Sequence, residues 1–257
     1  MRSLSILLLL AATSIADDTK PAAEAPKKKT AAEVEIPDPG TAVEDASVAR
    51  QEVARFEKDM REAKEPEKEA ALLERLGGWD HPEVLRAAQK YVKDKDVPVA
   101  VAAVVAVARQ GKSKEAAGKA LLGVVRSEKR TDILCAAMVG MGKVGYDNKA
   151  AISEAQKHFQ RDARETHKAA TRYFGYIKYK PAFRQLAEKL DAPHPANPND
   201  PNNPPESYWE ERWKEWDSNV PYTRWALSQI VEGETFETTA EAKQWAETEG
   251  KKHDIEW

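Results

Sequence analysis

The segment DVPVAVAAVVAVARQG, residues 96–111, decides the fold. It opens with Asp-x-Pro, continues as a run that is apolar almost all round, and ends in a glycine. Proline is tolerated in the first turn of a helix, and a helix without a polar face must be buried on several sides. The segment is therefore predicted to be a helix in the middle of a stack of other helices.

Ala103 in this segment has counterparts at a nearly constant spacing along the chain. The four alanines Ala70, Ala103, Ala137 and Ala170 lie 33, 34 and 33 positions apart, and the residues eight positions later are Gly78, Gly111, Gly145 and Lys178. A unit of this length holds two apolar helical patterns and is too short to bury a core of its own, so successive units must stack. The sequence predicts an all-α protein, an α-solenoid of about five stacked antiparallel helix pairs.

The predicted solenoid spans residues 46–257, with repeats at about 66–95, 96–129, 130–162, 163–191 and 217–250. A narrow apolar stripe over residues 46–63 predicts an N-terminal capping helix, because the end of a stack needs a polar cover. Asp80 is expected to cap the second helix of the first repeat. Residues 193–216 form an insertion, whose proline-rich first half excludes regular structure and whose tryptophan-rich second half predicts a short helix.

Several of these features resemble a known family. The opening Asp96-Val97-Pro98, the alanine at a fixed depth in each first helix and the glycine-containing turn are similar to HEAT-like repeats of the exported bacterial kind, over residues 66–191 and, more loosely, 217–250. The fourth repeat departs from the pattern because Lys178 replaces the turn glycine. The resemblance implies an armadillo-like helical fold whose usual role is to hold another molecule, although some HEAT-like proteins are enzymes.

The N-terminus predicts export. Residues 1–16 combine a positive start, a short apolar run and a small-x-small site, which is typical of a cleaved signal peptide. The following residues 17–45 are rich in Ala, Lys, Glu and Pro and predict a disordered leader. No segment reaches the length of about 20 apolar residues that a membrane span needs. We therefore expect a periplasmic or extracellular protein with no membrane span.

Charge is unevenly distributed along the chain, although the net charge is only −3. Residues 119–190 hold 15 Lys and Arg against 7 Asp and Glu, whereas residues 206–257 hold 6 against 13. The candidate binding residues in the basic block are Arg126, Lys149, Lys157, Arg161, Arg164, Lys168 and Arg172. They either receive an acidic protein or an anionic envelope polymer, or they solvate exposed helix faces. Export argues against nucleic acid as the ligand.

Trp209, Trp213 and Trp216 follow one another at i, i+4 and i+7, so a helix places them on one face. Such a stripe is either a binding platform or the contact that clamps the insertion onto the rest of the fold. The clamp is favoured because an exposed stripe of this size promotes aggregation.

Nothing in the sequence indicates catalysis. The five histidines have no metal-ligand spacing, and the single cysteine, Cys135, lies in an apolar helix without a local base. We therefore expect no cofactor, no metal site and no catalytic residues. The favoured function is a non-catalytic protein-binding scaffold or adaptor of the cell envelope. The alternatives are a HEAT-like enzyme or lyase-like enzyme accessory, and a structural envelope component that binds an anionic polymer.

Overall fold

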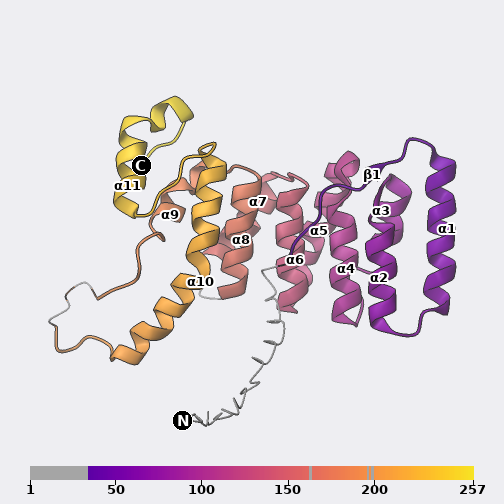
Figure 1. The fold of residues 1–257 in the computed structure, drawn as a ribbon, viewed down its shortest axis with the longest axis horizontal. Coiled ribbons are helices and arrows are strands. Elements are labelled where there is room, and N and C mark those ends of the chain that lie inside the picture. The colour runs from indigo at the N-terminus through magenta and orange to yellow at the C-terminus, as the bar shows by residue number, and fades with distance from the viewer. Residues whose placement is uncertain (1–33, 162–163, 196, 198–199) are drawn as a thin grey trace, which may run out of the picture.

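The helices of this protein lie in two rows that run side by side along the molecule (Figure 1). The structure is a computed structural model, and it describes residues 34–161, 164–195, 197 and 200–257. The all-α class is confirmed. The inner row contains α2 (Pro66–Leu76), α4 (Val97–Ala108), α6 (Thr131–Lys143), α8 (Arg164–Tyr176) and α10 (Glu206–Ile230). The outer row contains α3 (Pro82–Gln89), α5 (Lys114–Ser127), α7 (Lys149–Phe159) and α9 (Phe183–Ala187). Each helix of the inner row packs on the next one.

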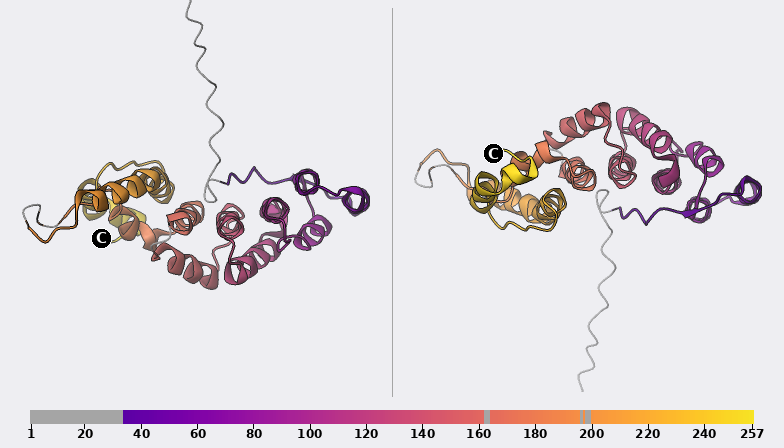
Figure 2. Two further views of the ribbon diagram at one scale, coloured as in Figure 1. Left: turned by 90° about the horizontal axis from the view of Figure 1, so that it is seen from below. Right: turned by 90° about the horizontal axis from the view of Figure 1, so that it is seen from above.

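Further elements close the two ends of the rows. Helix α1 (Ala46–Glu62) packs on α2 and α3 at one end, and α11 (Thr239–Thr248) packs near α9 at the other. The short turns of 3-10 helix are η2 (Gly111–Ser113), η3 (Lys180–Ala182) and η4 (Gly250–His253). Figure 2 shows that the rows are bowed, with the outer row on the convex side. Among the described residues, no helix is long and apolar enough to cross a membrane.

Helix α4 lies at the centre because its sequence has no polar face. Val99, Ala103 and Val107 are completely buried, and Pro98 occupies the first turn, where the missing N–H has no helical partner to lose. Helices α2 and α6 flank α4 in the inner row, and α3 and α5 cover its other side. The apolar run therefore forms the interior of the molecule, as its pattern predicts.

The turns after α6 and α8 have the same geometry 33 residues apart. The N–H of Tyr146 donates to the carbonyl of Met141 at 2.9 Å, and the N–H of Tyr179 donates to the carbonyl of Phe174 at 3.0 Å. This bond marks a helix end that is closed by a residue with positive φ, which is Gly145 (φ 70°) in the first turn. In the second turn Lys178 (φ 50°) takes the same conformation. The absent glycine therefore leaves the turn unchanged.

Residues 34–44 form an extended N-terminal strap on the inner row, so the prediction of a disordered leader is wrong for this part. The carbonyls of Val34 and Asp38 accept hydrogen bonds from the side chains of Arg172 and Arg109, at 3.0 and 2.9 Å. Ile36 is buried, and β1 (Thr41–Ala42) pairs in parallel with β2 (Trp79–Asp80). The prolines do exclude a helix, but tertiary hydrogen bonds fix the extended chain. The predicted signal peptide and the leader up to residue 33 lie outside the described residues.

The tryptophan-rich segment is continuous with the first helix of the fifth predicted repeat. Both belong to α10, which contains Pro221 in its interior. The predicted boundary between insertion and repeat at residue 216 is therefore wrong. Proline lacks the N–H that a helix uses and bends the helix without always ending it. Figure 1 shows that α10 changes direction along its length.

A buried histidine makes the stability of the fold sensitive to acid. His158 of α7 is 4% exposed, and its Nδ1 has no hydrogen-bond partner among the described residues. Burial lowers the pKa of His158 below its ordinary value of 6.5, and the nearby Arg161 lowers it further. Folding therefore favours the neutral ring. As pH falls through 6.5 the unfolded chain takes up the proton first, so the native state loses stability.

We expect the free energy of unfolding to fall between pH 7.5 and pH 5.5, with His158 contributing at most about 1.4 kcal/mol per pH unit. Urea unfolding at pH 7.5, 6.5 and 5.5 measures this slope. His158→Leu should flatten it, whereas His194→Leu, which removes an exposed histidine, should leave it unchanged. Equal slopes in the wild type and His158→Leu would show that His158 is not the group responsible.

Candidate functional site

Five of the seven predicted basic residues are exposed, and they lie on or beside the outer row. Arg126 is on α5, Lys149 and Lys157 are on α7, Arg161 follows α7, and Arg164 begins α8. Lys157 pairs with Glu154 of its own helix at 3.0 Å. Arg126, Lys149 and Arg161 have no carboxylate within ion-pair distance in the described part of the chain. We call Arg126, Lys149, Lys157 and Arg161 the outer basic surface.

Lys168 and Arg172 do not belong to an exposed basic face, so the prediction is wrong for these two residues. The side chain of Lys168 is only 3% exposed and lies 3.6 Å from Glu165. Arg172 is also buried, and its guanidinium donates to Val34 of the strap. Both cations lie about 6 Å from the ring of Tyr222 of α10. They face inwards because they occupy the side of α8 that α10 and the strap cover.

The tryptophans of α10 connect it to the segment that follows α9. The indole N–H of Trp216 donates to the carbonyl of Leu190 at 3.1 Å, and that of Trp213 donates to the carbonyl of Pro193 at 2.7 Å. Among the aromatic side chains that the structure describes, Trp209 contacts only that of its neighbour Tyr208, in an edge-on arrangement. These bonds favour the clamp for Trp213 and Trp216. Trp213 nevertheless remains 42% exposed, so part of its ring is free for contact.

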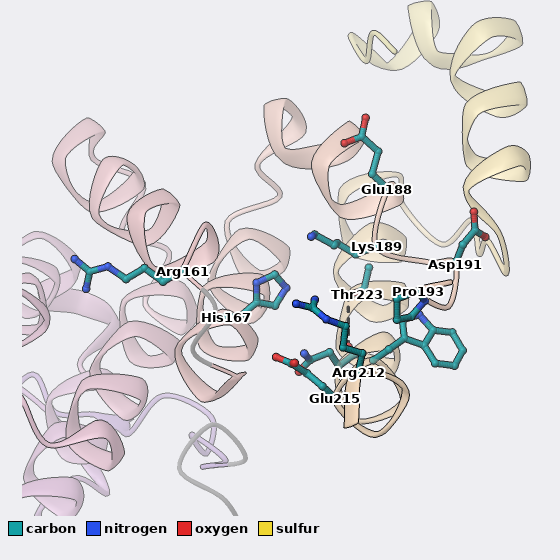
Figure 3. Close-up of a pocket in the computed structure, with 11 residues that line it drawn as sticks. Arg161, His167, Glu188, Lys189, Asp191, Pro193, Arg212, Glu215 and Thr223 are labelled. Atoms are coloured by element: carbon teal, nitrogen blue, oxygen red, sulfur yellow. Dashed lines mark hydrogen bonds between the residues drawn. The ribbon is translucent and has the colours of Figure 1, made fainter. Parts of the chain in front are cut away.

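A pocket of about 250 Å³ lies between α8, the end of α9 and the first half of α10 (Figure 3), and we call it the α8–α10 pocket. Its lining residues are Arg161, His167, Glu188, Lys189, Asp191, Pro193, Arg212, Glu215, Trp216, Asn219 and Thr223. The side chains of His167, Lys189 and Arg212 extend towards one another, whereas Arg161 points away from them. Of this set, only Arg161 and Trp216 are among the binding residues predicted from the sequence.

The charges of the pocket are only partly paired with one another. Glu188 pairs with Arg184 at 2.9 Å, and Asp191 accepts a hydrogen bond from the backbone of Thr239 at 3.1 Å. Lys189, Arg212 and Glu215 have no ion-pair partner among the residues that the structure describes. The pocket therefore presents two cations and one carboxylate that are available to a ligand.

The His167 ring and the Arg212 side chain are held in place by aromatic contacts. His167 stacks on Phe159 with ring centroids 4.4 Å apart, and its Nδ1 lies 2.8 Å from the carbonyl of Phe159. The guanidinium of Arg212 lies 4.8 Å from the centroid of the Tyr208 ring. Both polar groups are thus positioned before any ligand arrives, which lowers the entropic cost of binding.

The single cysteine lies where its thiol is unreactive. Cys135 is completely buried, and burial raises the pKa of its thiol to about 12, so it stays protonated at neutral pH. No group of three or more His, Cys, Asp or Glu side chains suited to a metal ion occurs in the described residues.

Comparison with known proteins does not assign the chain to a family. No model of a protein family matches it, and no curated protein is found to be similar in sequence.

Proposed function

We propose that this protein is an exported HEAT-like α-solenoid that binds an acidic protein partner of the cell envelope without catalysing a reaction. Three findings support the solenoid: the inner helices pack in sequence order, each of the first four predicted repeat ranges contains two α-helices, and the turns after α6 and α8 match at a spacing of 33 residues. In such a fold the exposed helices of successive units form one extended binding surface.

The observation that carries the binding proposal is the set of unpaired cations on the outer row. Arg126, Lys149 and Arg161 are exposed and lack carboxylate partners among the described residues. The opposite side of the rows carries the strap, whose carbonyls already use Arg109 and Arg172. The outer basic surface is therefore the available basic face for an acidic partner. Electrostatic complementarity of this kind speeds association and selects the partner.

The test is a charge reversal with a matched control. Arg126→Glu/Lys149→Glu/Arg161→Glu changes three exposed cations of the outer basic surface. Arg50→Glu/Arg55→Glu/Lys58→Glu makes the same change in charge on α1, at the end of the rows. Each protein is immobilised and used to capture its partner from the native envelope fraction at low and high salt, and circular dichroism checks helicity.

The first triple variant should retain at least tenfold less partner at low salt, and the α1 triple variant should stay within twofold of wild type. High salt should release the partner from the wild type, because exposed charges are screened over about 10 Å at 0.1 M salt. If the Arg126→Glu/Lys149→Glu/Arg161→Glu variant keeps its helicity and retains as much partner as the wild type, the outer basic surface does not bind the partner.

A further inference from the structure

We propose that the α8–α10 pocket binds a small hydroxylated carboxylic acid, of the size and chemistry of an acidic monosaccharide such as a uronic acid. Arg161 lines the pocket and also belongs to the outer basic surface, but its side chain extends away from Lys189 and Arg212 (Figure 3). The ligand proposal rests on Lys189 and Arg212, which the outer-surface variant leaves unchanged, so the two proposals are tested by different substitutions.

The size of the pocket limits the ligand. A volume of about 250 Å³ is below the range of about 300–1,000 Å³ of pockets that hold drug-sized molecules. One sugar ring with its substituents fits such a space. A protein segment would have to bind outside it, across the rim.

The cations of the pocket require an anionic group on the ligand. Lys189 follows α9 and Arg212 lies on α10, and Figure 3 shows both side chains directed into the space beside His167. Neither has a carboxylate within ion-pair distance among the described residues. A guanidinium presents a planar fork that matches a carboxylate, and that of Arg212 lies 4.8 Å from the centroid of the Tyr208 ring.

The acceptors of the pocket require hydrogen-bond donors on the same ligand. The carboxylate of Glu215 lines the pocket without an ion-pair partner in the described chain. The side-chain oxygen of Asn219, in the pocket wall, is buried and receives no hydrogen bond from the described residues. A buried acceptor without a donor is unfavourable, so the hydrogen bonding of the pocket wall is incomplete within the described residues. Sugar hydroxyls are neutral donors that suit the carboxylate of Glu215.

Trp216 supplies the apolar surface that a sugar ring uses. Its indole N–H donates to the carbonyl of Leu190, and the residue lines the pocket. A flat aromatic ring offers a large contact area to the apolar face of a sugar with little loss of side-chain entropy. Carboxylate, hydroxyls and an apolar ring face together define an acidic sugar, whereas an amino acid or inorganic anion uses only part of the site.

Isothermal titration with defined probes tests this assignment. The probes are glucuronate, its neutral analogue glucose, the simple anions acetate and phosphate, and the zwitterion glutamate. Arg212→Gln removes the charge of the pocket cation. Lys214→Gln makes the same change two residues away on α10, outside the pocket.

We expect glucuronate to bind at least tenfold more tightly than glucose, acetate, phosphate or glutamate. Arg212→Gln should weaken glucuronate binding at least tenfold, and Lys214→Gln should leave it within twofold. Three results would each overturn the proposal: no binding of glucuronate, equal binding of acetate, phosphate or glutamate, or full affinity in Arg212→Gln. A normal circular dichroism spectrum for Arg212→Gln shows that lost binding does not come from unfolding.

Discussion

Gly118→Ala is expected to lower the free energy of unfolding by about 2–3 kcal/mol, because it overpacks the contact between α5 and the turn after α6. A Cβ atom at residue 118 would overlap the ring of Tyr146. That ring has little room to move, since Tyr146 is 3% exposed and its carbonyl accepts a hydrogen bond from the hydroxyl of Tyr173 at 2.8 Å. The substitution therefore disturbs the junction between two helix pairs.

The same helix provides the control. A Cβ atom at Gly123 of α5 meets nothing within 4 Å. Gly123→Ala should stabilise the protein by about 0.5–1 kcal/mol, because alanine favours a helix over glycine by that amount. Equilibrium urea unfolding of both variants measures the difference. Similar effects of the two substitutions would contradict the described packing of Tyr146 against α5.

Gln110→Leu is expected to destabilise the protein by about 2–4 kcal/mol, because a fully buried side chain would lose three hydrogen bonds. The amide nitrogen of Gln110 donates to the carbonyls of Trp79 and Ala106, both at 3.0 Å. Its oxygen accepts from the N–H of His81 at 3.1 Å. Leucine fills a similar volume but leaves these backbone groups without their partner.

Gln89→Leu is the matched control, because Gln89 is only half-buried and its side chain makes no hydrogen bond with the described residues. It should change the free energy of unfolding by less than about 0.5 kcal/mol. Thermal or urea unfolding distinguishes the two variants. A small effect of Gln110→Leu would mean that Gln110 does not tie the first helix pair to the second.

The same junction shows why one local prediction was wrong. Asp80 was expected to cap α3, but Nδ1 of His81 accepts from the N–H of Glu83 at 3.1 Å and takes that role. The carboxylate of Asp80 instead accepts from the N–H of Lys112 at 2.8 Å. By sequence position alone, residue 80 and residue 81 can each cap α3. The hydrogen bond from Lys112, in the connection between α4 and α5, engages Asp80 and leaves the cap to His81.

The helices were predictable because burial leaves a period in the sequence. The apolar run of α4 and the alanines Ala103, Ala137 and Ala170 mark buried positions, and all three alanines are completely buried. The strap has no such period in its sequence. Its backbone carbonyls accept hydrogen bonds from Arg109 and Arg172, and any residue type can supply a backbone carbonyl. Charge counting also failed for Lys168, because it treats every cation on a helix as exposed.

The α8–α10 pocket was not predictable because its residues come from three separate segments. His167, Lys189 and Arg212 are more than 20 residues apart in sequence and become neighbours only when α10 packs on α8. The tryptophan stripe was the one signal in this region, and it identified α10 as the element to examine.

Lysine cross-linking of the captured complex, read by mass spectrometry, tests most directly whether the outer row holds a protein partner. Lys149 and Lys157 lie on the outer basic surface, whereas Lys143, at the end of α6, contacts the strap through Asp38 at 3.1 Å. The account predicts cross-links from the partner to Lys149 and Lys157 of the wild type, and loss of the Lys157 cross-link in the Arg126→Glu/Lys149→Glu/Arg161→Glu variant, which keeps Lys157. Cross-links that gather at Lys143 and persist in this variant would place the partner on the side of the strap and contradict the account.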